Sequence, residues 1–298
     1  MITTSPGRFD RSRLFALEVL REFRANQGLL LAGAVAYYTL LSLVPSLILI
    51  LIGLATVIDP QLLLDTLREY LEFFVPGQSG AVVSQLEVFL AHREVVSGIL
   101  LLSMLVFSAL AFTVLENAMS VIFLHRVSIR RRHFLMSAVM PYLFNVVLAV
   151  GLLIATVVSA KLSVLATRDV AVLGVMHSLG PLSNYLLYLF GVIGEILMLT
   201  AIYMVMPVGR VCWQHALIGG ATAGLLWEIT RHVLVWYYGT MSQIQVVYGS
   251  LATAIAVMLS VEIGAIFLLL GAQVIATYER RARSQARGAT TELRMQPS

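Results

Sequence analysis

Charged residues are scarce in this chain. Asp, Glu, Lys and Arg make up 12% of its 298 residues, about half of the roughly 25% that a soluble domain carries to keep its surface wetted. Hydrophobic residues make up 59%, and the mean hydropathy is +0.89. So much apolar surface must be buried in something other than water. The composition predicts a polytopic membrane protein, with one integral domain and no large soluble module.

The chain has a single cysteine and lacks the common catalytic motifs. The lone cysteine, Cys212, excludes an intramolecular disulfide and a multi-cysteine metal site. No HExxH, GxSxG or Walker A motif occurs, and no His and Asp residues cluster at metal-ligand spacing. We therefore expect neither an enzyme nor a metal or cofactor, and we expect no ATP-driven transport by this chain alone. The first 27 residues are polar and arginine-rich, unlike a cleavable signal.

Six apolar runs are each near the ~20 residues that cross about 30 Å of hydrocarbon. They cover residues 28–57, 95–124, 134–160, 182–206, 216–238 and 249–278. The prediction is an all-α fold, a polytopic bundle of six transmembrane helices over residues 28–278. It is flanked by a basic N-terminal segment, 1–27, and a basic, disordered tail, 279–298.

The basic residues predict the orientation. Fifteen of the twenty fall on one side of the predicted membrane, so by the positive-inside rule both termini are cytoplasmic. These fifteen are Arg8, Arg11, Arg13, Arg21, Arg24, Arg126, Arg130, Arg131, Arg132, Arg210, Arg280, Arg281, Arg283, Arg287 and Arg294. Their distribution follows topology rather than one nucleic-acid-binding face, so we expect membrane lipids as partners and no nucleic acid.

The first outer connection, residues 59–94, predicts two short amphipathic helices separated by a Pro-Gly break. In the first, Leu63, Leu67, Tyr70 and Leu71 share one face. Such helices lie at a membrane interface. Two roles fit the pattern: a simple cap on the bundle, or a lid or lipid-contacting collar.

Several ionisable residues fall inside the predicted spans, where a charge costs between roughly 3 and 15 kcal/mol. Glu228, Arg231 and His232 lie on one helical face of the fifth span. Glu228 and Arg231 are interpreted either as an ion pair that sets helix register or as a gate or substrate site. His232 is interpreted as a hydrogen-bond partner or a proton-relay member.

The other spans add further polar positions. Asn184 and Glu195 fall on one stripe of the fourth span, and Glu262 and Gln273 lie three turns apart in the sixth. Glu116 lies nearer the cytoplasm in the second span, where either snorkelling or a contact at the helix end explains it. Tyr38 precedes Pro45, which frees a backbone carbonyl in the first span. Glu195 and Glu262 have no partner within their own spans, so we expect them to be functional.

An acid-rich interior suits movement of protons or cations, or handling of an amphipathic molecule with a polar head. The leading hypothesis is a secondary transporter or a permease for lipids or other envelope components, with an unidentified small molecule, ion or lipid as substrate. Its polar path comprises Tyr38, Glu195, Glu228, Arg231 and Glu262, with Glu116, Asn184, His232 and Gln273 as accessory positions. The alternative is a non-transporting envelope-integrity or structural factor, and a ribonuclease is a distant third. The sequence leaves open whether the protein forms a homo-oligomer.

Several runs resemble one family. They are AYYTLLSLVPSLILIL at Ala36–Leu51, the stretch Glu116–Phe123, IGGATAGLLWE at Ile218–Glu228, and VYGSLATAIAVMLSVEIGAIFLLLGAQV at Val247–Val274. Together they resemble the YihY/BrkB family of bacterial inner-membrane proteins over about residues 15–280. The resemblance implies six spans and a multi-pass inner-membrane location. That family carries an old ribonuclease label, a virulence label and suggestions of envelope lipid transport. It commonly has an acidic residue where this chain has Gln273, and an aromatic near Glu262.

Overall fold

The structure is a computed structural model. It describes residues 8–74, 77–91, 98–123, 139, 142–143, 146–147, 149–158, 169–172, 175–178, 180–207, 211–240 and 250–295. The helices are α1 (Arg8–Ala25), α2 (Gly28–Leu54), α3 (Pro60–Phe74), α4 (Ser79–Ala91), α5 (Gly98–Ile122), α7 (Gly180–Val205), α8 (Trp213–Thr240) and α10 (Ser250–Met295), with a shorter apolar helix at Ala149–Val158. The predicted all-α class therefore holds for the described chain, apart from one antiparallel hairpin. Its strands are β1 (Asp169–Val172) and β2 (Val175–Ser178).

Three of the described helical segments are long and apolar enough to cross a membrane: Gly28–Leu54, Tyr185–Val205 and Ala254–Ser284. They match the predicted first, fourth and sixth spans. Val106–Ile122 and Ala149–Val158 are shorter apolar helices within the predicted second and third spans. In α8 the charges of Glu228 and Arg231 lower the hydropathy of the predicted fifth span. The helical membrane character is thus confirmed, while the count of six spans stays a prediction.

Two apolar cores form at opposite ends of the bundle. At one end α2, α5, α7, α8 and α10 converge around fully buried side chains such as Met119, Tyr203 and Leu269. At the other end, Ile48 and Leu51 of α2 pack against leucines of α3 and α4. Between the cores, the described side chains of residues 38–45 in α2 and 261–264 in α10 are only half-buried. Tyr38 and Glu262 fall in this middle zone.

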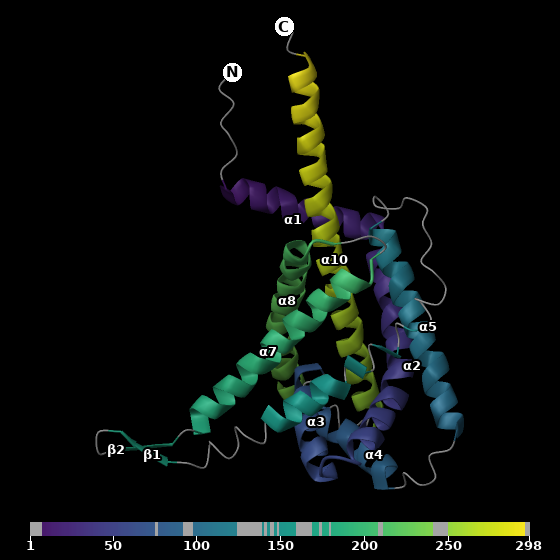
Figure 1. Ribbon diagram of the computed structural model, residues 1–298, viewed down its shortest axis with the longest axis vertical. Helices are drawn as coiled ribbons and strands as arrows, with labels where there is room; N and C mark the ends of the chain where they lie inside the picture. The colour runs from purple at the N-terminus through teal and green to yellow at the C-terminus, as the bar shows by residue number, and fades with distance from the viewer. Residues whose placement is uncertain are drawn as a thin grey trace.

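The ends of the bundle differ in what covers them. As Figure 1 shows, α1 lies across one end, where α10 extends beyond the other helices, and α3 and α4 lie at the opposite end. The sequence predicts a disordered tail from residue 279, whereas α10 continues as a helix to Met295. Arg280 and Arg281 of α10 form ion pairs with α1, and these pairs fix the start of the extension against α1.

The apolar face of α3 is buried, as its sequence pattern predicts. Leu63, Leu67 and Leu71 are buried against α2 and α4, which is the packing expected of a cap. Burial, with the nearby Glu69 carboxylate as a second cause, raises the pKa of the Tyr70 phenol to about 12. Tyr70 is therefore neutral at physiological pH.

Candidate functional site

Helix α8 carries a closed ion pair. The Arg231 Nη2 atom lies 2.5 Å from Glu228 Oε1, and Arg231 Nε donates to Glu228 Oε2 at 3.1 Å. The two side chains are 12% and 16% exposed. The three-residue spacing puts both groups on one face, and two parallel hydrogen bonds are the strongest geometry for such a pair.

Helix α7 completes this pair from the other side. The Tyr188 hydroxyl donates to Glu228 Oε1, and the Arg231 guanidinium lies 5.2 Å from the centroid of the Tyr188 ring. Tyr188 therefore contacts both charges at once, through its hydroxyl and its ring. The polar path predicted from the sequence did not include Tyr188, although Tyr188 lies between Asn184 and Glu195 on the same helix.

His232 is oriented toward the backbone. Its Nδ1 lies 2.8 Å from the Glu228 carbonyl oxygen, an oxygen that can only accept, so Nδ1 donates. The His232 side chain is 67% exposed. This geometry fits the hydrogen-bond interpretation of His232 better than the proton-relay one.

Glu195 lies two turns beyond Tyr188 on α7, close enough for its charge to interact with Glu228 and Arg231. Gly224 makes this approach possible: a Cβ added there would lie 2.9 Å from Ile196 Cγ1 and 3.9 Å from Glu195 Oε1. Because the glycine has no side chain, α8 packs closely against α7 at this level. Glu195 is therefore part of the same electrostatic group as the ion pair.

A cavity of about 510 Å³ opens beside this group. Its described lining residues come from four helices: Asp65, Arg68, Glu69, Glu72, Ser79, Tyr188 and Arg231. The charged face of α3 thus lies across the cavity from the Arg231 guanidinium. The pair predicted within the fifth span is not sealed in dry packing but borders an open space.

Capping contacts hold α3 and α4 in place around this cavity. At the start of α3, Asp59 Oδ1 accepts from Gln61 N at 2.9 Å and from Leu62 N at 3.3 Å. At its far end, Glu72 accepts from Gly77 N at 2.5 Å and from Ser79 Oγ at 2.6 Å. The Asp59 bonds satisfy backbone donors that the start of α3 leaves open, and the Glu72 bonds join the end of α3 to the start of α4.

Glu262 and Tyr38 lie apart from the ion pair. Glu262 on α10 approaches α2, because a Cβ added at Gly33 would lie 3.9 Å from its Oε1. The Tyr38 ring packs edge-on against Tyr37, with centroids 5.2 Å apart. Among the described residues, no hydrogen bond or ion pair joins either side chain to the Glu228 group. The five predicted path residues therefore divide into two groups, one between α7 and α8 and one near α2.

Two accessory positions lie on α5 and α7. Glu116 is half-buried on α5, and its backbone carbonyl accepts from Ser120 Oγ at 2.8 Å. Within the described ranges, its carboxylate has no hydrogen-bond partner. Asn184 lies in α7, but its side chain is outside the described residues.

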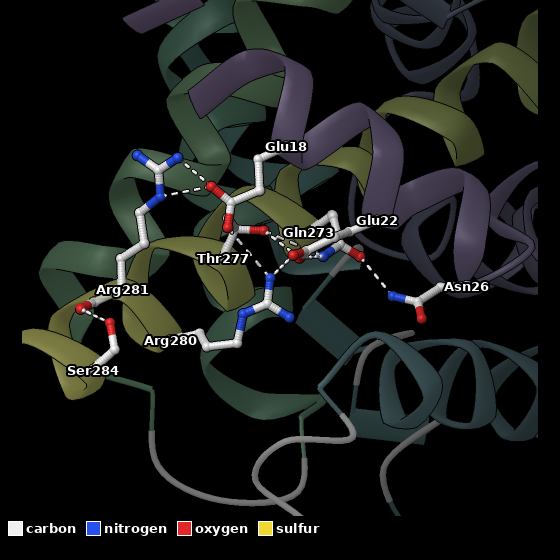
Figure 2. A network of polar contacts seen from close by, with 8 residues as sticks. All are labelled: Glu18, Glu22, Asn26, Gln273, Thr277, Arg280, Arg281 and Ser284. Carbon is white, nitrogen blue, oxygen red and sulfur yellow. Dashed lines mark hydrogen bonds and ion pairs between the residues drawn. The ribbon is translucent and has the colours of Figure 1, made fainter. Parts of the chain in front are cut away.

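Gln273 belongs to a different network, which joins α1 to α10 (Figure 2). Its Oε1 accepts from Asn26 Nδ2 at 2.9 Å, and its Nε2 donates to Glu22 Oε2 at 3.0 Å and to Thr277 Oγ1 at 3.3 Å. Gln273 is only 2% exposed. It is therefore occupied as a structural connector rather than as part of the predicted path.

Two arginines extend this connection along α10. Arg280 pairs with Glu22 and Arg281 with Glu18, and Thr277 Oγ1 donates to Glu22 Oε2 at 2.9 Å. This network was not predicted from the sequence. Its signal is a four-residue spacing on both helices, Glu18–Glu22–Asn26 against Gln273–Thr277–Arg281. In the described part of the chain, no group of three or more His, Cys, Asp or Glu residues could hold a metal ion.

Comparison with known proteins agrees with the resemblance found in the sequence. The family model described as Virulence factor BrkB matches residues 19–295. A UPF0761 membrane protein of Alkalilimnicola ehrlichii is 30% identical over 284 residues, which cover 92% of this chain and 60% of that protein. Another, from Halorhodospira halophila, is 26% identical over 92% of this chain and 58% of its own length. A third, from Aliivibrio fischeri strain MJ11, is 29% identical over 83% and 77%.

This chain therefore spans about 60% of the length of the first two relatives. No solved structure matches it. The family model covers nearly all of the described helices, from the last part of α1 to the end of α10. The chain belongs to the Virulence factor BrkB family and is a membrane protein of that family.

Proposed function

We propose that this protein is a six-span secondary transporter or a permease for lipids or other envelope components, located in the bacterial inner membrane with both termini in the cytoplasm. One observation carries the proposal: the Arg231–Glu228–Tyr188 group borders an open cavity of about 510 Å³. Glu195 lies two turns beyond Tyr188 on α7. The path would run from the cavity through Arg231 and Glu228 to Glu195.

The chemistry of this path favours a substrate with a polar or charged head. A guanidinium at a cavity wall can exchange its carboxylate partner for an anionic group, while the released carboxylate can accept a proton or a cation. Water in the cavity lowers the cost of opening the pair. Glu262 and Tyr38 remain proposed members of the path on the side of α2.

The ends of α8 support the proposed six-span topology. Trp213 and Trp236 are both largely exposed, at 59% and 70%, and they lie 23 residues apart. At 1.5 Å per residue this is about 34 Å, close to the hydrocarbon thickness, and tryptophans are enriched at both membrane interfaces. Helix α1 and the α10 extension lie together at one end of the bundle (Figure 1). Both segments are rich in arginine, which suits the cytoplasmic side.

A non-transporting structural factor is the second candidate. The observation that favours it is the completeness of the Glu228–Arg231 pair, which already satisfies both charges without a ligand. Buried polar pairs can serve only to specify helix packing. The two candidates differ in whether the cavity is wet and whether anything moves along the path.

The cavity is expected to be open to water from the outer side. In a Cys212→Ser background, Tyr188→Cys should react with a membrane-impermeant maleimide in sealed cells. Leu189→Cys is the matched control, since it is the next residue on α7 and is 40% exposed toward the surface that lipid would cover. We expect a rate at least about tenfold higher at position 188, because an apolar environment suppresses the reactive thiolate. Equal, slow labelling at both positions would contradict a wet cavity.

Glu195 is expected to be required for movement of protons or lipid headgroups. Purified protein would be reconstituted into vesicles in two arms: trapped pyranine reports proton entry under a potassium diffusion potential, and a fluorescent phosphatidylglycerol reports lipid movement between leaflets. In whichever assay the unsubstituted protein shows movement, we expect Glu195→Gln to lower the rate to that of protein-free vesicles. The reason is that the amide cannot bind and release a proton. Glu87→Gln, an exposed site on α4, is the control. If the unsubstituted protein shows no rate above protein-free vesicles in either arm, the structural candidate is favoured.

A further inference from the structure

Helix α1 has two faces of opposite character. Its inner face, with Val19 and Phe23 buried, also carries Glu18 and Glu22. Both carboxylates form ion pairs with α10: Glu18 with Arg281, and Glu22 with Arg280. The acidic side chains described on α1 are therefore neutralised on the side that faces the bundle.

The outer face of α1 alternates leucine and arginine. Leu14, Leu17 and Leu20 are 56%, 54% and 54% exposed. Three basic residues, Arg13, Arg21 and Arg24, are exposed on the same half of the helix. At 100° per residue, these six positions fall within about 120° of one another. A helix surrounded only by water would not present three leucines between its arginines.

The position of α1 matches the depth of lipid headgroups. Only Asn26 and Gln27 separate α1 from α2, and Gln27 has a left-handed backbone with φ of 54°. This sharp turn keeps α1 at the membrane end of the first spanning helix. Figure 1 shows α1 lying across the direction of α2, α5 and α10 at this end, as an in-plane helix would.

We propose that α1 is an in-plane membrane helix whose outer face binds anionic phospholipid headgroups. The leucines enter the boundary between headgroups and acyl chains, and Arg13, Arg21 and Arg24 contact phosphates. The charge of the face selects the partner: with Glu18 and Glu22 paired inward, the outer face over the described side chains 13–25 carries basic residues and no acidic one. Through the contacts of Gln273, Arg280 and Arg281, the lipid-bound helix would hold the start of the α10 extension. This inference rests on the membrane location of the chain and not on transport.

The test uses the full-length protein in nanodiscs. In a Cys212→Ser background, Leu17→Cys is labelled with bimane, and quenching is measured with a shallow nitroxide carried by phosphatidylglycerol or by phosphatidylcholine at equal mole fraction. Ser284→Cys, exposed on the α10 extension, is the matched control. We expect quenching at position 17 to be about twofold or more stronger with phosphatidylglycerol, and to lose this preference in high salt. Position 284 should be quenched by neither lipid.

Two variants separate charge from folding. The triple variant R13Q/R21Q/R24Q should lower phosphatidylglycerol quenching to the phosphatidylcholine level, whereas R13K/R21K/R24K should keep the preference because it keeps the charge. The proposal is overturned by equal quenching from both lipids. It is also overturned if aqueous iodide quenches position 17 as strongly as position 284, which would show a water-facing helix, or if no quencher reaches it, which would show a second protein copy on this face. These quenching results can be interpreted even if the vesicle assay shows no transport, because they depend only on where α1 lies.

Discussion

Arg231→Met is expected to lower the free energy of unfolding by about 3–5 kcal/mol, because it leaves the Glu228 carboxylate without its cation in a mostly buried position. Tyr188 would still donate one hydrogen bond to that carboxylate, which is not enough to replace a bidentate guanidinium. The double variant E228Q/R231M should recover most of the loss, since it removes the second charge as well. The measurement is unfolding of purified protein by titration with sodium dodecyl sulfate.

Arg283→Met is the matched control for this prediction. Arg283 is an exposed arginine on the α10 extension, and its loss should change stability by no more than about 0.5 kcal/mol. If the double variant is as unstable as the single one, packing of the arginine chain, rather than charge pairing, holds this part of α8. If R231M has no effect, the cavity solvates Glu228 well enough that the pair adds nothing to stability.

Gly271→Ala is expected to destabilise the protein by about 1–3 kcal/mol, through overpacking between α8 and α10. A Cβ added at Gly271 would clash with the Tyr203 hydroxyl oxygen and would lie 2.9 Å from the backbone oxygen of Gly219. Tyr203 is fully buried and donates to the Leu268 carbonyl at 2.7 Å, so it cannot swing aside without losing that bond. The Gly219 oxygen belongs to the opposing helix, which would have to move.

Gly264→Ala on the same helix supplies the control. Its added Cβ would meet nothing closer than Trp227 Cζ3 at 3.9 Å, so alanine should be neutral or stabilising by up to about 1 kcal/mol from helix propensity. The same detergent unfolding measurement applies to both variants. Adding Tyr203→Phe to Gly271→Ala should recover only part of the loss, because the clash with the Gly219 backbone remains. Equal stability of G271A and G264A would contradict close packing of α8 against α10.

Local features of the site followed from helix periodicity alone. Glu228 and Arg231 share a face because they are three residues apart, and the structure forms their ion pair. The apolar face of α3 was likewise predictable, and its leucines are buried. Residues on one helix keep a nearly constant relation whatever the helix packs against, so such pairs need no knowledge of the fold.

Contacts between helices did not follow in this way. Gln273 was predicted to share a path with Glu262, since eleven residues place them on one stripe, but it hydrogen-bonds to α1 instead. Tyr188 joins Glu228 across 40 residues, and Gln273 meets Asn26 across 247. Nothing in the spacing within a helix specifies which neighbour its polar face will meet.

The sequence by itself determined that this is a helical membrane protein, where its long apolar helices fall, and which ionisable residues share a helix face. These conclusions depend on composition and on the 3.6-residue period, which are properties of each segment alone. Only the tertiary structure decided that Arg231 faces a cavity beneath α3, that Glu195 joins its group, and that α1 is fastened to α10. The physical reason is that lipid accepts any apolar face equally well, so the choice of helix neighbours rests on close glycine contacts and polar pairs that form only after packing.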